Sequence, residues 1–209
     1  MWSGGEENAQ ACVIGCFGQL SADRLLERGN PGVPFSDMNR DINAALDVLV
    51  GKPLWSSGRA ADLQWFSFGD RKATTNARGE PLEVGEYALH VQCSWRIRRG
   101  DKVIVARPDL YHSAQAESAG NMDFDDEAAG MGGNRRDARI SELFRDGAEM
   151  FPVQRIEAGA AGNFSIFFDG ELVMEVFPDD SLSDEHWRFF KPRTREPHIV
   201  CTGSGVHTE

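Results

Sequence analysis

The sequence predicts an α+β protein built on a predominantly antiparallel β-sheet, either a sandwich or a partial barrel, with one main helix packed on the sheet. Three observations lead to this fold class. The first is a long alternation of apolar and polar residues in the middle of the chain, and the second is a set of short strand patterns in the C-terminal third. The third is an amphipathic helix pattern that precedes these strand patterns in the sequence. Short polar links between the predicted strands favour antiparallel hairpins, because parallel neighbours need long crossover connections.

The clearest strand pattern covers residues 87–97. Apolar residues from Tyr87 to Ile97 occupy every second position and alternate with Ala, His, Gln, Ser and Arg, so the strand has one apolar and one polar face. A turn at residues 98–100 then leads into a second apolar run, and Gly100 stands where a three-residue loop needs a left-handed residue. We therefore predict a hairpin in which Ile97 pairs with Asp101.

One amphipathic helix is predicted over residues 37–50, and we expect it to cover the apolar face of the sheet. Gly51 stands at the position of a left-handed C-cap. A second, shorter helix is predicted over residues 137–146. The apolar stripe of the first helix includes Ile42, Leu46 and Leu49.

Further strand patterns surround these elements. Residues 62–69 precede the long strand, and Asp169-Gly170 between two apolar runs is typical of a type I′ hairpin turn, whose two central residues need positive φ. Together these patterns predict a meander of hairpin-connected strands. The strands predicted in the C-terminal third are 150–157, 163–168, 172–177, 185–190 and 198–201.

Two stretches lack any such pattern. Residues 1–35 are rich in Gly and are expected to form a loop-rich N-terminal segment, while residues 36–209 are expected to form a single domain. Inside that domain, residues 112–136 are dominated by Gly, Ala, Asn and acidic residues. A run of this length without periodicity is typical of a long flexible loop.

The chain carries a net charge of −11, which bears on its partners. An acidic surface repels phosphate backbones, so we expect no nucleic-acid binding, whereas it attracts a basic protein partner. No apolar run approaches the roughly 18 residues of a membrane span, and the N-terminus lacks signal-peptide features, so we expect a cytoplasmic protein. Pairing of exposed edge strands between two copies makes a homodimer a further possibility.

The polar face of the long strand is the first candidate site. A histidine and an arginine on one face of a sheet suit an anion or another small ligand. The solvent-facing side of an antiparallel sheet has the same pattern, so both interpretations stay open. The residues of this candidate ligand site are His90, Gln92, Ser94 and Arg96.

The second candidate is an interface formed by His186, Trp187 and Arg188, because an arginine between aromatic residues is typical of protein interfaces.

An acidic run at residues 123–127 offers oxygen ligands, but Ala128 and Asn134 stand where an EF-hand loop needs Gly and Glu. We therefore assign no catalytic residue, no metal and no cofactor from the sequence.

Residues 86–97 and 185–188 resemble segments of small uncharacterised bacterial proteins, over about residues 39–200. The size and acidity are also similar to those of antitoxin or immunity proteins. Our leading expectation is therefore a non-enzymatic binding or interaction protein of the bacterial cytosol. The alternative is a small-molecule-binding or hydrolytic domain that uses the polar sheet face around His90 and Arg96.

Overall fold

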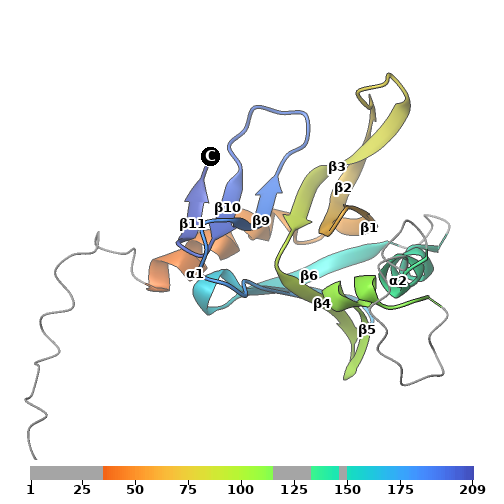
Figure 1. Cartoon of the computed structure of the whole chain (residues 1–209). Helices are drawn as coiled ribbons and strands as arrows, with labels where there is room; N and C mark the ends of the chain where they lie inside the picture. Colours follow the sequence, from red (N-terminus) through yellow and green to blue (C-terminus); the bar gives the residue numbers. More distant parts are fainter. Residues whose placement is uncertain (1–34, 115–132, 146–149) are drawn as a thin grey trace, which may run out of the picture. The chain divides into compact units, whose positions relative to one another are not determined.

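The computed structural model describes residues 35–114, 133–145 and 150–209, all within the unit Val33–Glu209. Eleven strands, all paired antiparallel, form one open sheet in the order β11-β10-β9-β3-β2-β1-β6-β7-β8-β4-β5 (Figure 1). The described elements are α1 Phe35–Leu46, η2 Asp47–Leu49, β1 Pro53–Ala60, β2 Leu63–Thr75, β3 Pro81–Val91, β4 Ser94–Arg99, β5 Lys102–Ala106, η3 Arg107–Tyr111, α2 Arg135–Leu143, β6 Phe151–Ala158, η5 Ala160–Gly162, β7 Phe164–Phe168, β8 Leu172–Phe177, β9 Glu185–Phe190, β10 Ile199–Thr202 and β11 Gly205–Thr208. The predicted α+β class with a mostly antiparallel sheet is confirmed. The expectation of one main helix is only partly right, because α1 and α2 are two short helices.

Helix α1 covers the core from one end. Ile42, Leu46 and Leu49 are fully buried in the main apolar cluster, as their spacing predicts. The side-chain oxygen of Asn43 accepts a hydrogen bond from the backbone N–H of Ala158 at 3.0 Å, which ties α1 to β6. Gly51 has a φ of 81° after the final 3₁₀ turn, η2. No helix in the described part of the chain has the length and apolarity needed to cross a membrane.

The predicted strand 87–97 is two strands, so this part of the prediction is wrong. The chain turns at Gln92 and Cys93, whose backbone N–H groups both donate to the carbonyl oxygen of His186, at 2.8 and 3.1 Å. As a result β3 pairs with β2 and β9, whereas β4 pairs with β5 and β8. The apolar alternation continues through the corner, because Val91, Cys93 and Trp95 are all buried.

The predicted register of the β4–β5 hairpin is also wrong. Arg99 pairs with Lys102, and a bulge brings Ile97 opposite Val105 instead of Asp101. This register places two fully buried side chains together and leaves Lys102 exposed. The β7–β8 turn is similarly displaced, because its positive φ values fall at Gly170 and Glu171, one residue later than predicted.

The strands of the C-terminal third lie within one residue of their predicted bounds. Two strands were missed. β1 lacks a clean alternation, and β11 has only four residues. In addition, β2 and β3 are longer than the strands predicted at 62–69 and 87–97, because β2 continues to Thr75 and β3 begins at Pro81.

Strands far apart in the sheet share one core. The ring of Phe66 on β2 meets Trp95 on β4 edge to face at 5.5 Å, and Phe164 on β7 meets Trp187 on β9 at 5.2 Å. The two parts of the sheet are joined through a short β1–β6 ladder at Pro53 and Leu54. Figure 1 shows β1–β3 and β9–β11 above β4–β6, so the sheet folds over its own apolar face.

Helix α2 is held by charged contacts as well as by its apolar stripe. Ile140 and Leu143 form its buried apolar stripe, and the fully buried Arg136 bonds through its guanidinium to the β1–β2 turn at Asp62. Most of the predicted loop 112–136 lies outside the described residues, as do residues 1–34. At its described flanks Ser113 and Asn134 form an isolated β-bridge.

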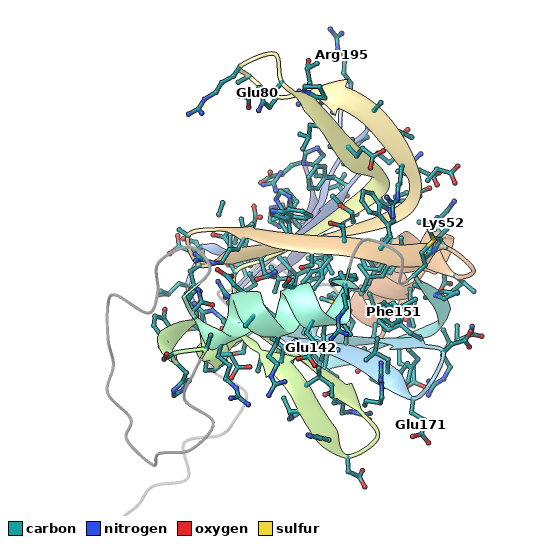
Figure 2. All side chains as sticks on the ribbon, turned by 90° about the vertical axis from the view of Figure 1, so that its right-hand side faces the viewer. Lys52, Glu80, Glu142, Phe151, Glu171 and Arg195 are labelled. Atoms are coloured by element: carbon teal, nitrogen blue, oxygen red, sulfur yellow. The ribbon has the colours of Figure 1, made fainter. Side chains whose placement is uncertain are left out.

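The β2–β3 hairpin is bent, and this bend positions the candidate site. Gly69 and Asp70 together lie opposite the single residue Glu86, and Gly69 has a φ of 74°. Such a bulge bends and twists the strand that carries it. Figure 2 shows the hairpin curling upward, with Glu80 near its tip and Arg195 of the β9–β10 link also at the top of the view. The tip is held there, because the guanidinium of Arg193 donates to the carbonyl oxygen of Thr75 at 3.0 Å.

Candidate functional site

The four residues of the first candidate site do not form one site. His90 lies on β3 and lines a pocket on the outer face of the sheet. Beyond the corner at Gln92, which lines a different cavity, Ser94 donates a hydrogen bond to Asp179 at 2.5 Å. Arg96 is exposed on β4 and pairs with Glu175 at 2.5 Å. The break between β3 and β4 separates the histidine from the arginine.

The pocket beside His90, which we call the His90 pocket, has a volume of about 320 Å³ and a predominantly apolar lining. It lies in the bend of the β2–β3 hairpin and is completed by Phe190 at the end of β9. Its principal walls are Trp65, Leu82, Val84 and Phe190.

Small side chains make this part of the sheet hollow. Ser67, Gly85 and Ala88 line the pocket between its larger walls, and Ala88 pairs with both Ser67 and Phe190 across the three strands. The Trp65 ring is fixed over Gly58 of β1, where any Cβ would collide with it. The hollow therefore results from side-chain size on neighbouring strands, combined with the bulge-induced bend.

Three polar side chains line this pocket, those of Ser67, Glu83 and His90, and the carboxylate of Glu83 is paired with Arg71 at 3.6 Å. The ring of His90 contacts Phe190 edge to face at 4.8 Å, and no hydrogen bond to its ring nitrogens occurs within the described residues. Burial lowers the pKa of His90, opposed by nearby Glu185 and reinforced by Arg188 and His198. The ring is therefore held in its neutral form, which offers one donor and one acceptor.

A hydrogen-bonded network supports the pocket from behind. Phe190 stacks on His198 at 4.7 Å, and the Nδ1 atom of His198 lies 2.9 Å from the guanidinium of Arg188. Arg188 in turn donates to Glu185 and to Glu209 at 2.7 and 2.8 Å. These bonds raise the pKa of Arg188 and lower that of Glu209. Strand β9, His198 just before β10, and Glu209 just after β11 thereby fix the orientation of the Phe190 wall.

The lowered pKa of His90 predicts a pH-dependent stability. In the unfolded chain a histidine takes up a proton near pH 6.5, whereas folded His90 does so only at lower pH, so acidification favours the unfolded state. We expect the urea midpoint to fall between about pH 7.5 and pH 5.5, and to fall less in His90→Gln. The matched control is His207→Gln, at an exposed position on β11, which should keep the wild-type decrease. Equal decreases in all three proteins would contradict the prediction.

A second cavity, which we call the acidic cavity, lies at the start of β9 and has a volume of about 310 Å³. Its lining includes Gln92, Cys93 and Arg107 on one side. Burial raises the pKa of the Cys93 thiol to about 12, so this thiol is protonated at neutral pH. The remaining lining residues are Asp179, Asp180, Asp184, Glu185 and His186.

Two residues of the predicted interface, His186 and Trp187, lie inside the protein. They are 3% and 0% exposed, whereas Arg188 is half-buried in its bonds to Glu185 and Glu209. His186 lies where β9 bulges against β10, because Trp187 pairs with Cys201 while Glu185 pairs with Thr202. This bulge lets two successive side chains, His186 and Trp187, both be buried.

Sequence reasoning named His90, Gln92 and His186 but missed the other residues that line these cavities. The spacing of Asp179 and Asp180 before Asp184-Glu185-His186 was a usable signal for the acidic cavity, since five titratable side chains fall within eight residues. No local signal pointed to Trp65 or Phe190, because these residues reach the His90 pocket only through strand pairing.

Comparison with protein-family models, with curated proteins and with solved structures finds no match to this chain. The structure itself therefore provides the description of the protein. It is an α+β protein with an antiparallel sheet whose outer face carries a pocket. The resemblance to small bacterial proteins stays a prediction.

Proposed function

We propose that this chain is a binding protein and that the His90 pocket holds its ligand, a small molecule with a planar apolar body and one hydrogen-bonding group. The observation that carries the proposal is an apolar hollow of about 320 Å³ beside a histidine with no hydrogen-bond partner among the described residues. Pockets for small ligands are typically mostly apolar, with a few polar groups that orient the ligand.

The chemistry of the walls selects the ligand class. Trp65 and Phe190 offer aromatic surfaces, and Leu82 and Val84 offer aliphatic ones. The neutral imidazole of His90 accepts a hydrogen bond from a ligand N–H or O–H, or donates one to an acceptor. A planar ring system with one polar edge can pack against the apolar walls and form a hydrogen bond with His90.

Indole is the probe for the first test. We expect indole to shift the backbone amide resonances of Val84, Ala88 and His90 in a ¹⁵N NMR titration of the full chain. Val84→Trp fills the pocket and should weaken the binding of indole at least about tenfold, which corresponds to about 1.4 kcal/mol.

The matched control is Val103→Trp, which adds the same ring on β5 at a residue that is 48% exposed and outside the pocket. It should bind indole as the unmodified protein does. The proposed site would be refuted if Val84→Trp bound indole with unchanged affinity, or if indole shifted only the amide resonances of residues outside the pocket. Urea unfolding of both variants establishes that each remains folded.

An interaction protein with a basic partner is the second candidate. It is supported by the net charge of −11 and by the exposed acidic residues of the β8–β9 link, Asp179, Asp180 and Asp184. The test is a pull-down with the full chain at low and high salt, in which a specific basic partner should be lost when these three residues are changed to Asn. Retention of the same partner by the triple variant would count against this candidate.

A further inference from the structure

Asp179, Asp180 and His186 bring three metal-binding side chains together at the acidic cavity. One ligand atom from each lies within 4.8 Å of the others. A cluster of carboxylates does not by itself indicate a metal site, because exposed acidic residues often gather in solvent. This cluster differs because it also contains a histidine whose ring nitrogen is buried.

The Nε2 atom of His186 is buried without a hydrogen-bond partner in the described part of the chain. The residue is 3% exposed and lines the cavity together with the two aspartates. A buried polar nitrogen without a partner destabilises the folded state, so such atoms are usually paired with a protein group, a water molecule or an ion. The backbone fixes this residue in place, because its carbonyl oxygen accepts from both Gln92 and Cys93.

The separation between His186 and Asp180 fits a shared ion better than a direct hydrogen bond. Nε2 lies 3.6 Å from Oδ1 of Asp180, beyond hydrogen-bond distance. Two ligand atoms on one tetrahedral zinc ion lie about 3.4 Å apart, given metal–ligand bonds of about 2.1 Å. The atoms are thus spaced as an ion between them would require.

Both aspartates are already oriented by other groups. Asp179 accepts a hydrogen bond from the Ser94 hydroxyl at 2.5 Å, and Asp180 accepts one from the backbone N–H of Leu182 at 2.8 Å. The loop that carries them packs against Gly203, whose N–H donates to the carbonyl oxygen of Leu182 and where a Cβ would collide with the loop backbone. Groups that form hydrogen bonds with metal ligands in this way hold the ligands in the orientation that binding needs.

The charge balance of the cavity favours a cation. Four carboxylates line it, including Asp184 and Glu185, against the single guanidinium of Arg107. Arg107 is itself paired with Asp62 at 2.5 Å, which offsets its charge. The carboxylate of Glu185 is engaged by Arg188. The side chains whose ligand atoms come within 4.8 Å of one another are those of Asp179, Asp180 and His186.

We propose that Asp179, Asp180 and His186 bind a divalent transition-metal ion of the zinc type at the mouth of the acidic cavity. An imidazole ligand selects zinc over magnesium or calcium, which prefer oxygen ligands only. Three protein ligands leave a coordination position for water, and the exposed aspartates leave that position accessible to solvent. This site shares no lining residue with the His90 pocket, so either proposal can fail without the other.

Zinc itself is the probe. The full chain, freed of metal with a chelator, is titrated with Zn²⁺ and with Mg²⁺ by calorimetry. Cys12 and Cys16 are changed to Ser in every protein tested, so that these thiols do not take zinc. We expect one Zn²⁺ per chain and binding at least about tenfold tighter than that of Mg²⁺.

Two variants test the ligands. Asp180→Asn keeps the acceptor for Leu182, and His186→Phe keeps the ring volume. Each should weaken zinc binding at least about tenfold, since even an outer partner of a metal site typically contributes 10–100-fold. Asp101→Asn, in the exposed β4–β5 turn, is the matched control and should bind zinc normally. Because Asp180 has a side chain that is 48% exposed, its variant should fold whether or not His186→Phe does.

A spectroscopic readout distinguishes a metal ligand from a structural residue. On addition of Zn²⁺ the Nε2 resonance of His186 should shift in a ¹⁵N spectrum of the imidazoles, while that of His207 stays unchanged. Equal affinity for Mg²⁺ and Zn²⁺, unchanged zinc binding in Asp180→Asn, or an unshifted Nε2 resonance would each overturn the proposal. In those cases the three side chains lie close together without binding a metal ion.

Discussion

Replacing Trp187 by alanine is expected to lower the free energy of unfolding by about 3–5 kcal/mol, the usual range for a large aromatic side chain removed from a core. Trp187 is 0% exposed and meets Phe164 edge to face at 5.2 Å. Its Nε1–H also donates to the carbonyl oxygen of Gly162 at 2.8 Å. The alanine variant thus loses ring contacts between β9 and β7 and leaves a buried carbonyl group unpaired. Urea unfolding followed by circular dichroism measures the effect.

Two further substitutions test this account of Trp187. Trp187→Phe keeps most of the ring but loses the donor, so it should cost about 1–2 kcal/mol, as expected for one buried hydrogen bond. Leu182→Ala, at a residue that is 59% exposed, should change stability by no more than about 0.5 kcal/mol. If Trp187→Ala were no more destabilising than Leu182→Ala, the core role assigned to Trp187 would be wrong.

Gly85→Ala is expected to destabilise the protein by about 3 kcal/mol, at the upper end of the usual cost of overpacking. A Cβ at Gly85 would lie 2.6 Å from the carbonyl oxygen of Tyr87 and 2.8 Å from the backbone nitrogen and oxygen of Phe68. These are backbone atoms of the paired strands beside the bulge, so they move only if β2 and β3 separate. Because the bulge bends the hairpin over the His90 pocket, the same change should weaken indole binding.

Gly79→Ala provides the comparison for Gly85→Ala. Gly79 has a φ of 80°, and a Cβ added there would meet no atom within 4 Å, so its substitution adds backbone strain but no collision. We expect a cost of about 1–2 kcal/mol, from the left-handed conformation alone. Hydrogen exchange should then show faster exchange at the amides of Phe68 and Tyr87 in Gly85→Ala, and unchanged exchange there in Gly79→Ala. Identical exchange at these amides in both variants would disprove the steric explanation.

The sequence predicted well those features that depend on neighbouring residues. The bounds of β6–β10 and the buried stripes of α1 and α2 follow from periodicities of two and 3.6 residues. The apolar residues of the alternation at residues 87–97 are all buried, although Ala88, assigned to the polar face, is buried as well. The alternation did not reveal the corner at Gln92 and Cys93, because that corner is fixed by bonds to His186, which is far away in the sequence.

The candidate sites could be predicted less well than the strands, because they too depend on contacts between residues that are distant in the sequence. His90, predicted as part of a ligand site, lines a pocket, but its expected neighbour Arg96 lies on the far side of the corner, paired with Glu175. Gln92 instead lines the acidic cavity, and Ser94 bonds to one of the residues that line it, Asp179, across 85 positions of the chain. A single strand pattern thus contributed residues to two separate cavities.

By itself, the sequence determined the fold class, most strands and which faces are apolar, because these depend on side-chain types a few residues apart. Only the tertiary structure decided where the long strand breaks, which strands pair, and that two hollows form. Those outcomes depend on contacts between distant residues, such as Trp65 over Gly58 and His186 against Gln92 and Cys93. Their energies are set by packing and hydrogen bonding that no local pattern records.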